Sequence, residues 1–208
     1  MKSRNGGARL DIDVWRTLPR METPRLCLRP FILSDSEDVY AYASDRRVTQ
    51  WTLWEAHANV TVSRLMVQSV VERYSAAPYF CWAIEEKRQG KVIGHCGFDD
   101  HWHRHSHRAR FAYVLARDFW GEGIEWEAGR EILRFGFTEL ELHRVTGRCL
   151  RDDTQAERIY QRLGLTYEGM LWDHVWSKGQ FRTVKYYGLL APEYFARVAM
   201  MRARAALE

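Results

Sequence analysis

One glycine-bearing turn constrains the fold of this chain more than any other feature of its sequence. Gly121 and Gly123 lie between two strand-like segments, 109–116 and 143–150, and a helical pattern fills residues 123–140. A strand–helix–strand unit usually joins neighbouring parallel strands, because its connection must cross one face of the sheet. We therefore expect segments 109–116 and 143–150 to be parallel neighbours.

The rest of the chain alternates between the periods of strands and helices. Further strand-like segments are found at 25–31, 79–86, 91–99, 166–176 and 181–190. Helical spacing is found at 34–43, 61–76 and 154–163, and again from Pro192 onwards. This order predicts an α/β (α+β) fold, with a mixed sheet of about seven strands flanked by helices.

Three local signals predict where two of these helices begin or end. Ser34 with Glu37, and Thr154 with Glu157, have the spacing of capping boxes, in which side chains bond the free N–H groups of a first helical turn. Gly164 stands where a glycine in the left-handed conformation commonly ends a helix.

Composition limits the class of protein. The chain has 208 residues, of which 46% are apolar and 28% charged, so a packed domain is expected and general disorder is excluded. We expect residues 1–20 to be an N-terminal extension and residues 21–208 to be a single domain. No apolar run is long enough for a signal peptide or a membrane span. Four widely spaced cysteines without a CxxC pair favour reduced thiols and a cytoplasmic location.

Four segments of the chain, taken in order, form a recognisable pattern. They are residues 22–31, 120–128, 139–145 and 160–169. With these segments, the chain from residue 21 to about 193 is similar to the GNAT superfamily of acyl-CoA-dependent N-acyltransferases, and within it to the branch that acetylates ribosomal-protein N-termini. The resemblance implies a splayed central sheet, in which the two parallel strands diverge at one end.

The resemblance also implies a donor and the residues that bind it. The donor would be acetyl-CoA, with its pantetheine arm between the two diverging strands. Backbone amides of residues 121–126 would hold its pyrophosphate at a helix N-terminus, where N–H groups lack helical partners. The predicted donor-binding residues are Trp120, Gly121, Glu122, Gly123, Ile124, Glu125, Trp126 and Asp153.

Three residues are candidates for the chemistry. By the resemblance, an amine attacks the thioester directly and Tyr160 protonates the departing thiolate. A phenol suits this role, because it is neutral near pH 7 yet can donate a proton. Tyr160 also lies on the apolar stripe of its helix, so simple packing is the alternative. Asp99 and His107 are candidates for a base beside the acceptor, since they lie near the end of a strand and in a His-rich segment.

Glu125 and Trp126 depart from the family pattern, which has small residues there. Two unit charges about 5 Å apart at an effective dielectric near 20 repel by roughly 3 kcal/mol. A helix N-terminus returns only about 0.3–1 kcal/mol to an anion. A Glu125 carboxylate that faces the phosphates would therefore weaken CoA binding, with the bulk of Trp126 adding to the effect. The alternative is that Glu125 turns outward to solvent.

Other functions and partners stay open at this point. The fold could use another donor, such as an aminoacyl-tRNA or a carrier-protein thioester, or could be a binding protein without catalysis. The acceptor would be a small-molecule or peptide amine. We expect no membrane partner, and no nucleic acid unless the donor is linked to tRNA. A homodimer is compatible with the sequence. Trp51, Trp54, Trp172 and Trp176 would border the acceptor cleft or fill the core. The imidazoles of 101–107 lack the Cys or carboxylate spacing of a metal site, so none is predicted.

Overall fold

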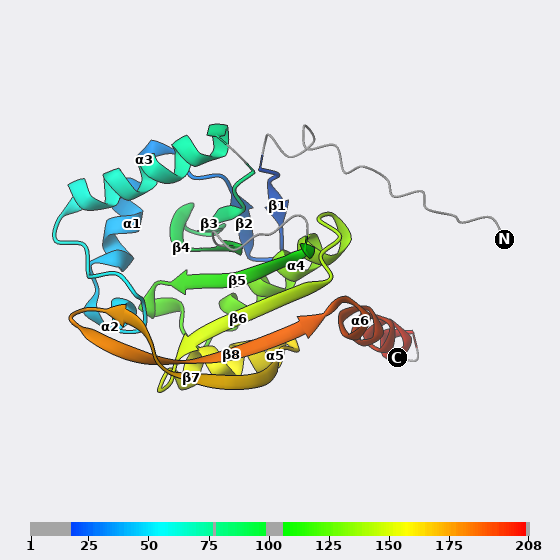
Figure 1. The fold of residues 1–208 in the computed structure, drawn as a ribbon. Helices are drawn as coiled ribbons and strands as arrows, with labels where there is room; N and C mark the ends of the chain where they lie inside the picture. Colours follow the sequence, from blue (N-terminus) through cyan, green and yellow to red (C-terminus); the bar gives the residue numbers. More distant parts are fainter. Residues whose placement is uncertain (1–17, 77, 99–105, 207–208) are drawn as a thin grey trace.

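A computed structural model describes residues 18–76, 78–98 and 106–206, and its centre is a single eight-stranded sheet (Figure 1). The strand order is β1-β2-β3-β4-β5-β6-β8-β7. The strands are β1 Met21–Glu22, β2 Leu26–Arg29, β3 Cys81–Glu86, β4 Lys91–Phe98, β5 Arg108–Leu115, β6 Arg144–Leu150, β7 Thr166–Ser177 and β8 Gln180–Leu190. The helices are α1 Ser36–Ala43, α2 Arg46–Thr49, α3 Val60–Ala76, α4 Ile124–Thr138, α5 Thr154–Leu163 and α6 Ala191–Ala205. The predicted mixed α/β fold is confirmed, and the short β1 brings the sheet to eight strands.

The parallel pair at the centre of the sheet is the predicted one. β5 and β6 are parallel neighbours, while the other strand pairs in the described ranges are antiparallel. Their register runs only from Arg108 opposite Arg144 to Phe111 opposite Gly147. Beyond that point β5 stays paired with β4 as far as Leu115, and β6 stays paired with β8. The two strands therefore separate over the second half of β5.

Helices cover both faces of the sheet and give the protein two apolar cores. One core lies under α4 and α5, whose apolar stripes face the sheet because their hydrophobic residues repeat at helical spacing. The second core lies under α1 and α3 on the other face. Buried residues of the first core include Phe111, Ile124, Ile132, Phe135 and Tyr160, and those of the second include Phe31, Val39, Tyr42, Val67 and Val70.

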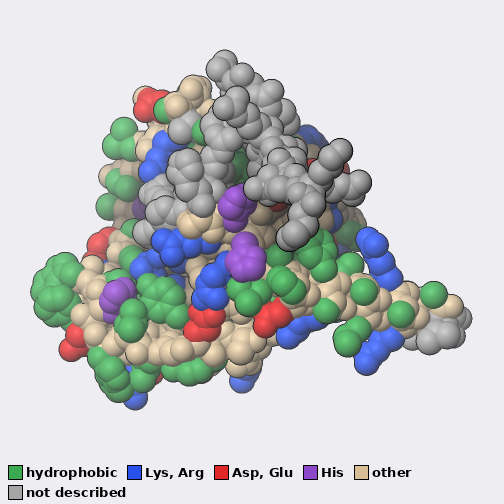
Figure 2. Space-filling view, turned by 45° about the vertical axis from the view of Figure 1, so that its right-hand side comes forward, with side chains coloured by type: hydrophobic (Ala, Val, Ile, Leu, Met, Phe, Trp, Pro, Cys, Tyr) green, Lys and Arg blue, Asp and Glu red, His purple; other side chains and the backbone are tan. Residues whose placement is uncertain are grey.

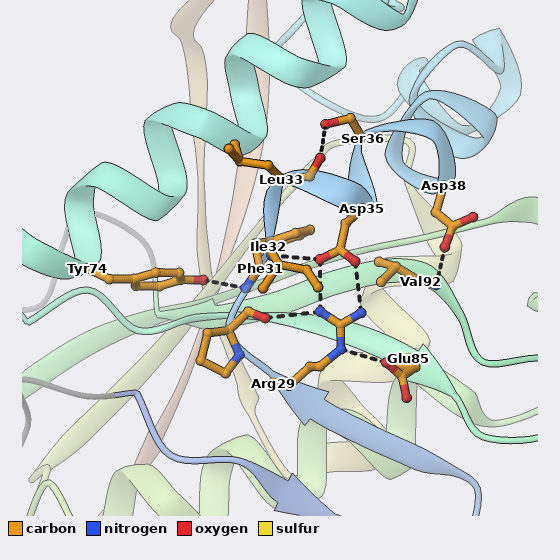
Figure 3. A network of polar contacts seen from close by, with 11 residues as sticks. Arg29, Phe31, Ile32, Leu33, Asp35, Ser36, Asp38, Tyr74, Glu85 and Val92 are labelled. Carbon is orange, nitrogen blue, oxygen red and sulfur yellow. Dashed lines mark hydrogen bonds and ion pairs between the residues drawn. The ribbon is translucent and has the colours of Figure 1, made fainter.

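Arg29 ties α1 to the sheet (Figure 3). Its guanidinium donates to both carboxylate oxygens of Asp35 at 2.8 Å and to Glu85 Oε2 at 2.5 Å. Asp35 also accepts the N–H of Ile32 at 2.9 Å, and it directly precedes α1. The predicted Ser34–Glu37 capping box is therefore wrong: Asp35 precedes the first residue of α1, and its carboxylate bonds to Arg29 and the Ile32 N–H and makes no capping hydrogen bond to α1.

The start of α5 differs from its capping pattern too, but here the helix begins one residue earlier than predicted. Asp153 is the capping residue, and its Oδ1 accepts the N–H of Ala156 at 3.0 Å. Glu157 bonds instead to Lys185 and to the hydroxyl of Tyr187, at 2.5 and 2.9 Å. The end of α5 is as predicted: Gly164 has φ +98°, a conformation that favours glycine.

None of the helices in the described part of the chain is long and apolar enough to cross a bilayer.

Ordered packing begins before residue 21: Leu18 is buried, and the Pro19 carbonyl accepts a hydrogen bond from Trp82 Nε1 at 2.7 Å. The division at residue 20 stays a prediction.

Candidate active site

A cavity of about 120 Å³ lies where β5 and β6 separate. β5 and β6 contribute two of its walls, and residues from the start of α5 and from the α2 region line the rest. Its lining residues are Val48, Trp51, Thr52, Ala112, Tyr113, Val114, Leu115, Trp120, Arg148, Cys149, Asp153, Gln155, Ala156 and Tyr160. The cavity therefore brings together three of the predicted site residues, Trp120, Asp153 and Tyr160.

Tyr160 is fixed at the point where the two strands part. Its hydroxyl donates to the carbonyl of Arg148 at 3.0 Å, one residue beyond the last β5–β6 pair. Its ring meets the rings of Phe111 and Tyr113 edge-on, with centroids 6.4 Å away in both cases. Burial raises the pKa of Tyr160, so the phenol keeps its proton at neutral pH. Both a packing role and a proton-donor role are compatible with this position.

The Tyr160 ring lies directly against the backbone of Gly147. A Cβ atom added at Gly147 would be 2.8 Å from the ring, which is closer than non-bonded carbons approach. Glycine at position 147 therefore lets α5 bring the phenol up to the edge of β6.

The predicted donor turn is exposed and held in place by Arg25. Gly121 and Gly123 have φ values of +80° and +77°, and a Cβ added at Gly121 would meet nothing within 4 Å. Arg25 donates to the Glu122 carbonyl at 3.0 Å and to Glu127 Oε2 at 2.7 Å. Because the first N–H groups of α4 have no helical acceptors, this turn offers an open anion site at a helix N-terminus.

Glu125 is buried beside this turn, which excludes the alternative that its side chain turns outward to solvent. The residue is 2% exposed, and its Oε1 accepts a hydrogen bond from Gln155 Nε2 at 3.1 Å. Burial raises the pKa of Glu125, although the hydrogen bond from Gln155 and the charges of Arg162 and Arg25 oppose the shift. The carboxyl group thus bridges the N-terminal turns of α4 and α5, next to the cavity that Gln155 lines.

The Trp126 side chain does not fill the cavity. The guanidinium carbons of Arg130 and Arg162 each lie 4.6 Å from an indole ring centroid of Trp126. The indole lines a separate groove between α4 and α6. The indole ring of Trp126 therefore does not add the steric bulk that we expected at the donor site, because two arginines hold it on the outer surface of α4.

Of the two predicted bases, the described residues include only His107, and it does not line the cavity. Asp99 lies outside the described residues. His107 precedes β5 at the end opposite the cavity, about 20 Å along the strand from Tyr113. Its Nδ1 is 3.2 Å from the Glu141 carbonyl oxygen. This position gives no support to His107 as a base beside the acceptor, and that role stays a prediction. Among the described residues, no cluster has the side chains to hold a metal ion.

Sequence reasoning missed Gln155, Cys149 and the Arg148 carbonyl, all of which line or border the cavity. The position of Gln155 could have been predicted, since it lies in the first turn of the helix that follows a central strand. The role of the Arg148 carbonyl could not, because every residue type has this backbone group and the sequence does not distinguish it.

Known proteins match both the sequence and the fold. The Acetyltransferase (GNAT) domain family matches residues 25–166. An uncharacterized N-acetyltransferase of Bacillus licheniformis, p20, is 31% identical over 174 residues, which cover 83% of this chain and 96% of that protein. This chain belongs to the GNAT acetyltransferase family and is an acyl-CoA-dependent N-acetyltransferase.

Two solved structures of related fold name different acceptors. The ribosomal-protein-S5-alanine acetyltransferase of Vibrio fischeri is 17% identical, covering 85% of this chain and 98% of that one, with a TM-score of 0.73. The spermidine N-acetyltransferase of Vibrio cholerae, solved with CoA and spermine, is 18% identical, covering 83% and 99%, with a TM-score of 0.69. At these identities the likeness shows the fold alone.

Proposed function

We propose that this enzyme transfers an acetyl group from acetyl-CoA to an amine in the cavity between β5 and β6. The observation that carries the proposal is the Tyr160 hydroxyl at the strand separation, 3.0 Å from the Arg148 carbonyl oxygen. Acetyl-CoA would supply the activated thioester. The amine lone pair attacks the thioester carbonyl, the C–S bond breaks, and Tyr160 gives its proton to the thiolate. The amine loses its extra proton to solvent or to a base, and the Tyr160 phenolate takes up a proton from solvent, which restores the phenol.

Several features of the chain support a CoA donor. The exposed turn at Gly121 and the N-terminus of α4 suit a pyrophosphate. Residues 112–115 of β5 have no strand partner on the side of β6, so their backbone groups are available to an amide-containing arm. Glu125 opposes this fit, because its buried carboxyl lies beside the turn. We therefore propose a weaker CoA affinity than the same turn would have without a carboxylate.

We further propose that the acceptor is a peptide N-terminus or another amine of low charge, and not a polyamine. A second cavity beside α2 is lined by Arg46, Lys178 and only one carboxylate, Glu55. Lys178 Nζ also bonds to the Thr49 carbonyl, and Ser177 Oγ donates to the Leu53 carbonyl at 2.9 Å, so the β7–β8 turn closes over the α2 region. A polycation would be repelled by these cations.

The test is an acetylation assay with defined amines. Purified protein is mixed with acetyl-CoA and either spermidine or peptides that begin with Ala or Ser, and thiol release and product mass are measured. Acetylated peptide is expected, with little product from spermidine. Acetyl-CoA at about 100 times its dissociation constant should stabilise the fold by about 2.7 kcal/mol. The absence of both stabilisation and thiol release would contradict the proposed donor.

A cytoplasmic location, supported by four free cysteines, and a homodimer stay predictions.

A further inference from the structure

A further concave surface lies between α4 and α6, apart from the cavity at the strand separation and from the one beside α2. Its volume is about 570 Å³, and residues 22–24 also line it. Figure 2 shows α6 projecting at the lower right, with arginine or lysine side chains interspersed among hydrophobic ones along its length. We call this surface the arginine groove after the five arginines that line it: Arg130, Arg134, Arg162, Arg197 and Arg202.

The arginine groove carries positive charge that the described residues do not neutralise. Its three acidic side chains already have partners. Glu127 pairs with Arg25 at 2.7 Å, Glu131 pairs with Arg134 at 2.7 Å, and Glu22 pairs with Arg20 at 2.8 Å and Lys87 at 2.7 Å. Within residues 18–76, 78–98 and 106–206, no carboxylate pairs with the remaining arginines of the groove. Two of these, Arg130 and Arg162, are held in place by stacking on Trp126, so their charges are pre-positioned.

The floor of the groove is apolar, and α6 is poorly supported by the rest of the chain. Leu133, Tyr194, Val198 and Met201 line the floor. Tyr194 anchors the first turn of α6 by stacking on Phe137 with ring centroids 4.5 Å apart. Beyond it Met201 is 58% exposed, and no described side chain of α6 is buried. A helix of this length is marginal in water without a packed face, so a partner on the groove would stabilise it.

We propose that the arginine groove binds an acidic segment of a partner protein, with apolar side chains at helical spacing that rest on the floor and carboxylates that pair with the arginines. A single RNA strand fits less well, because the Trp126 ring is already covered by two guanidinium groups and cannot serve as a stacking platform. A flat bilayer does not enter a concave groove. A symmetric contact of two α6 helices would bring arginines against arginines, since Glu193 is their only acidic residue within 191–205.

The experiment is a selection followed by a binding measurement on the full chain. A phage-displayed random peptide library of about 16 residues, long enough for an amphipathic helix, is selected on immobilised protein. Enriched sequences should be rich in Asp and Glu, with Leu, Ile, Phe or Met three or four residues apart. The strongest binder is then labelled and its affinity measured by fluorescence anisotropy at low and high salt, where affinity should fall as salt rises.

The groove variant is Arg130→Glu with Arg202→Glu, and the matched control is Arg88→Glu in the exposed turn between β3 and β4. The double variant should weaken peptide binding at least about tenfold and keep the cooperative unfolding of the parent, whereas Arg88→Glu should change little. Enrichment of neutral or basic peptides, or equal binding by the double variant, would overturn the proposal. So would binding of a single-stranded RNA or anionic vesicles in place of the peptide, or a dimer that the double variant loses in sedimentation.

Discussion

A buried tyrosine whose hydroxyl bonds to a backbone carbonyl keeps its proton and can donate it to a stronger acceptor. The Arg148 carbonyl holds the Tyr160 hydroxyl at the edge of the strand separation, and burial raises its pKa so that the proton stays on the phenol. A thiolate formed beside it would be a far stronger acceptor than a carbonyl. The arrangement therefore favours proton transfer only after the C–S bond begins to break.

Tyr160→Phe tests this role, with Tyr187→Phe as the matched control. Both variants lose one phenol hydroxyl, but Tyr187 bonds to Glu157 and does not line the cavity. Tyr160→Phe should lower kcat by about 10²- to 10⁴-fold, the usual contribution of a general acid. Tyr187→Phe should cost about 1 kcal/mol of stability with activity retained. A Tyr160→Phe turnover within about twofold of the parent would show that the ring only packs.

Glu125→Gln tests the electrostatic cost of the carboxyl at the donor turn. Glutamine keeps a hydrogen-bonding partner for Gln155 but removes the charge. CoA should bind about tenfold more tightly, or more, and the gain should shrink at high salt and at acid pH, where the parent carboxyl is protonated. Glu122→Gln, in the exposed part of the same turn, is the control and should change the affinity little. Calorimetry that finds equal affinities for parent and Glu125→Gln would contradict this explanation.

At the scale of elements, the sequence predicts most of the strands and helices and the parallel strand pair, but it predicts less well where each helix begins. The parallel pairing of β5 and β6 follows from the length of the connection, and the end of α5 follows from Gly164. The start of α5 is less certain because Asp152, Asp153 and Thr154 are all good caps. Which of them bonds the helix depends on where β6 ends, and that is a tertiary property.

The same limit applies to the site. Tyr160 and the glycine turn are visible as motifs, since both stand at fixed offsets from helix ends. The burial of Glu125 is not visible, because it depends on how α4 crosses α5 and on the reach of Gln155. The placement of Trp126 likewise depends on Arg162, which lies 36 residues away in the chain.

The capping role of Asp153 gives a prediction for α5 as a whole. Asp153→Ala should lower the free energy of unfolding by about 1 kcal/mol, because the Ala156 N–H loses its acceptor in a buried setting. Asp153→Asn should retain most of the stability, since an amide oxygen can also cap. Asp152→Ala is the matched control: its side chain is 84% exposed and should matter little. Urea denaturation measures all three, and equal loss for Asp152→Ala and Asp153→Ala would contradict the assignment of the cap.

At the scale of the whole molecule, the face of the sheet under α1 carries a titratable group of its own. The hydroxyl oxygen of Tyr42 lies 3.0 Å from His95 Nδ1, and the imidazole packs edge-on against Phe31. Burial lowers the pKa of His95 to about 4, from a usual value of 6.5. Between those two values the unfolded chain binds a proton that the folded chain does not, so the stability of the fold rises with pH.

The protein should therefore lose stability on acidification from pH 7 to pH 5, by up to about 2 kcal/mol from this histidine. His95→Gln should reduce the difference between the two pH values, even if it is less stable at both. His174→Gln, at an exposed histidine of β7, should leave the difference unchanged. Glu125 acts in the opposite direction, because its raised pKa favours the folded state at lower pH. Equal pH dependence in the parent and His95→Gln, measured by denaturant titration, would contradict the role of His95.

The close approach of the Tyr160 ring to Gly147 restricts how this protein can change over evolution. Any larger residue at 147 forces the ring away, at a cost of about 1–3 kcal/mol, as long as the tyrosine is present. Replacing the tyrosine first makes room but removes the hydroxyl at the strand separation. Each single step is therefore unfavourable, although a double change is sterically allowed. The two positions, one on a strand and one on a helix, should be inherited together as a pair in lineages that keep the phenol.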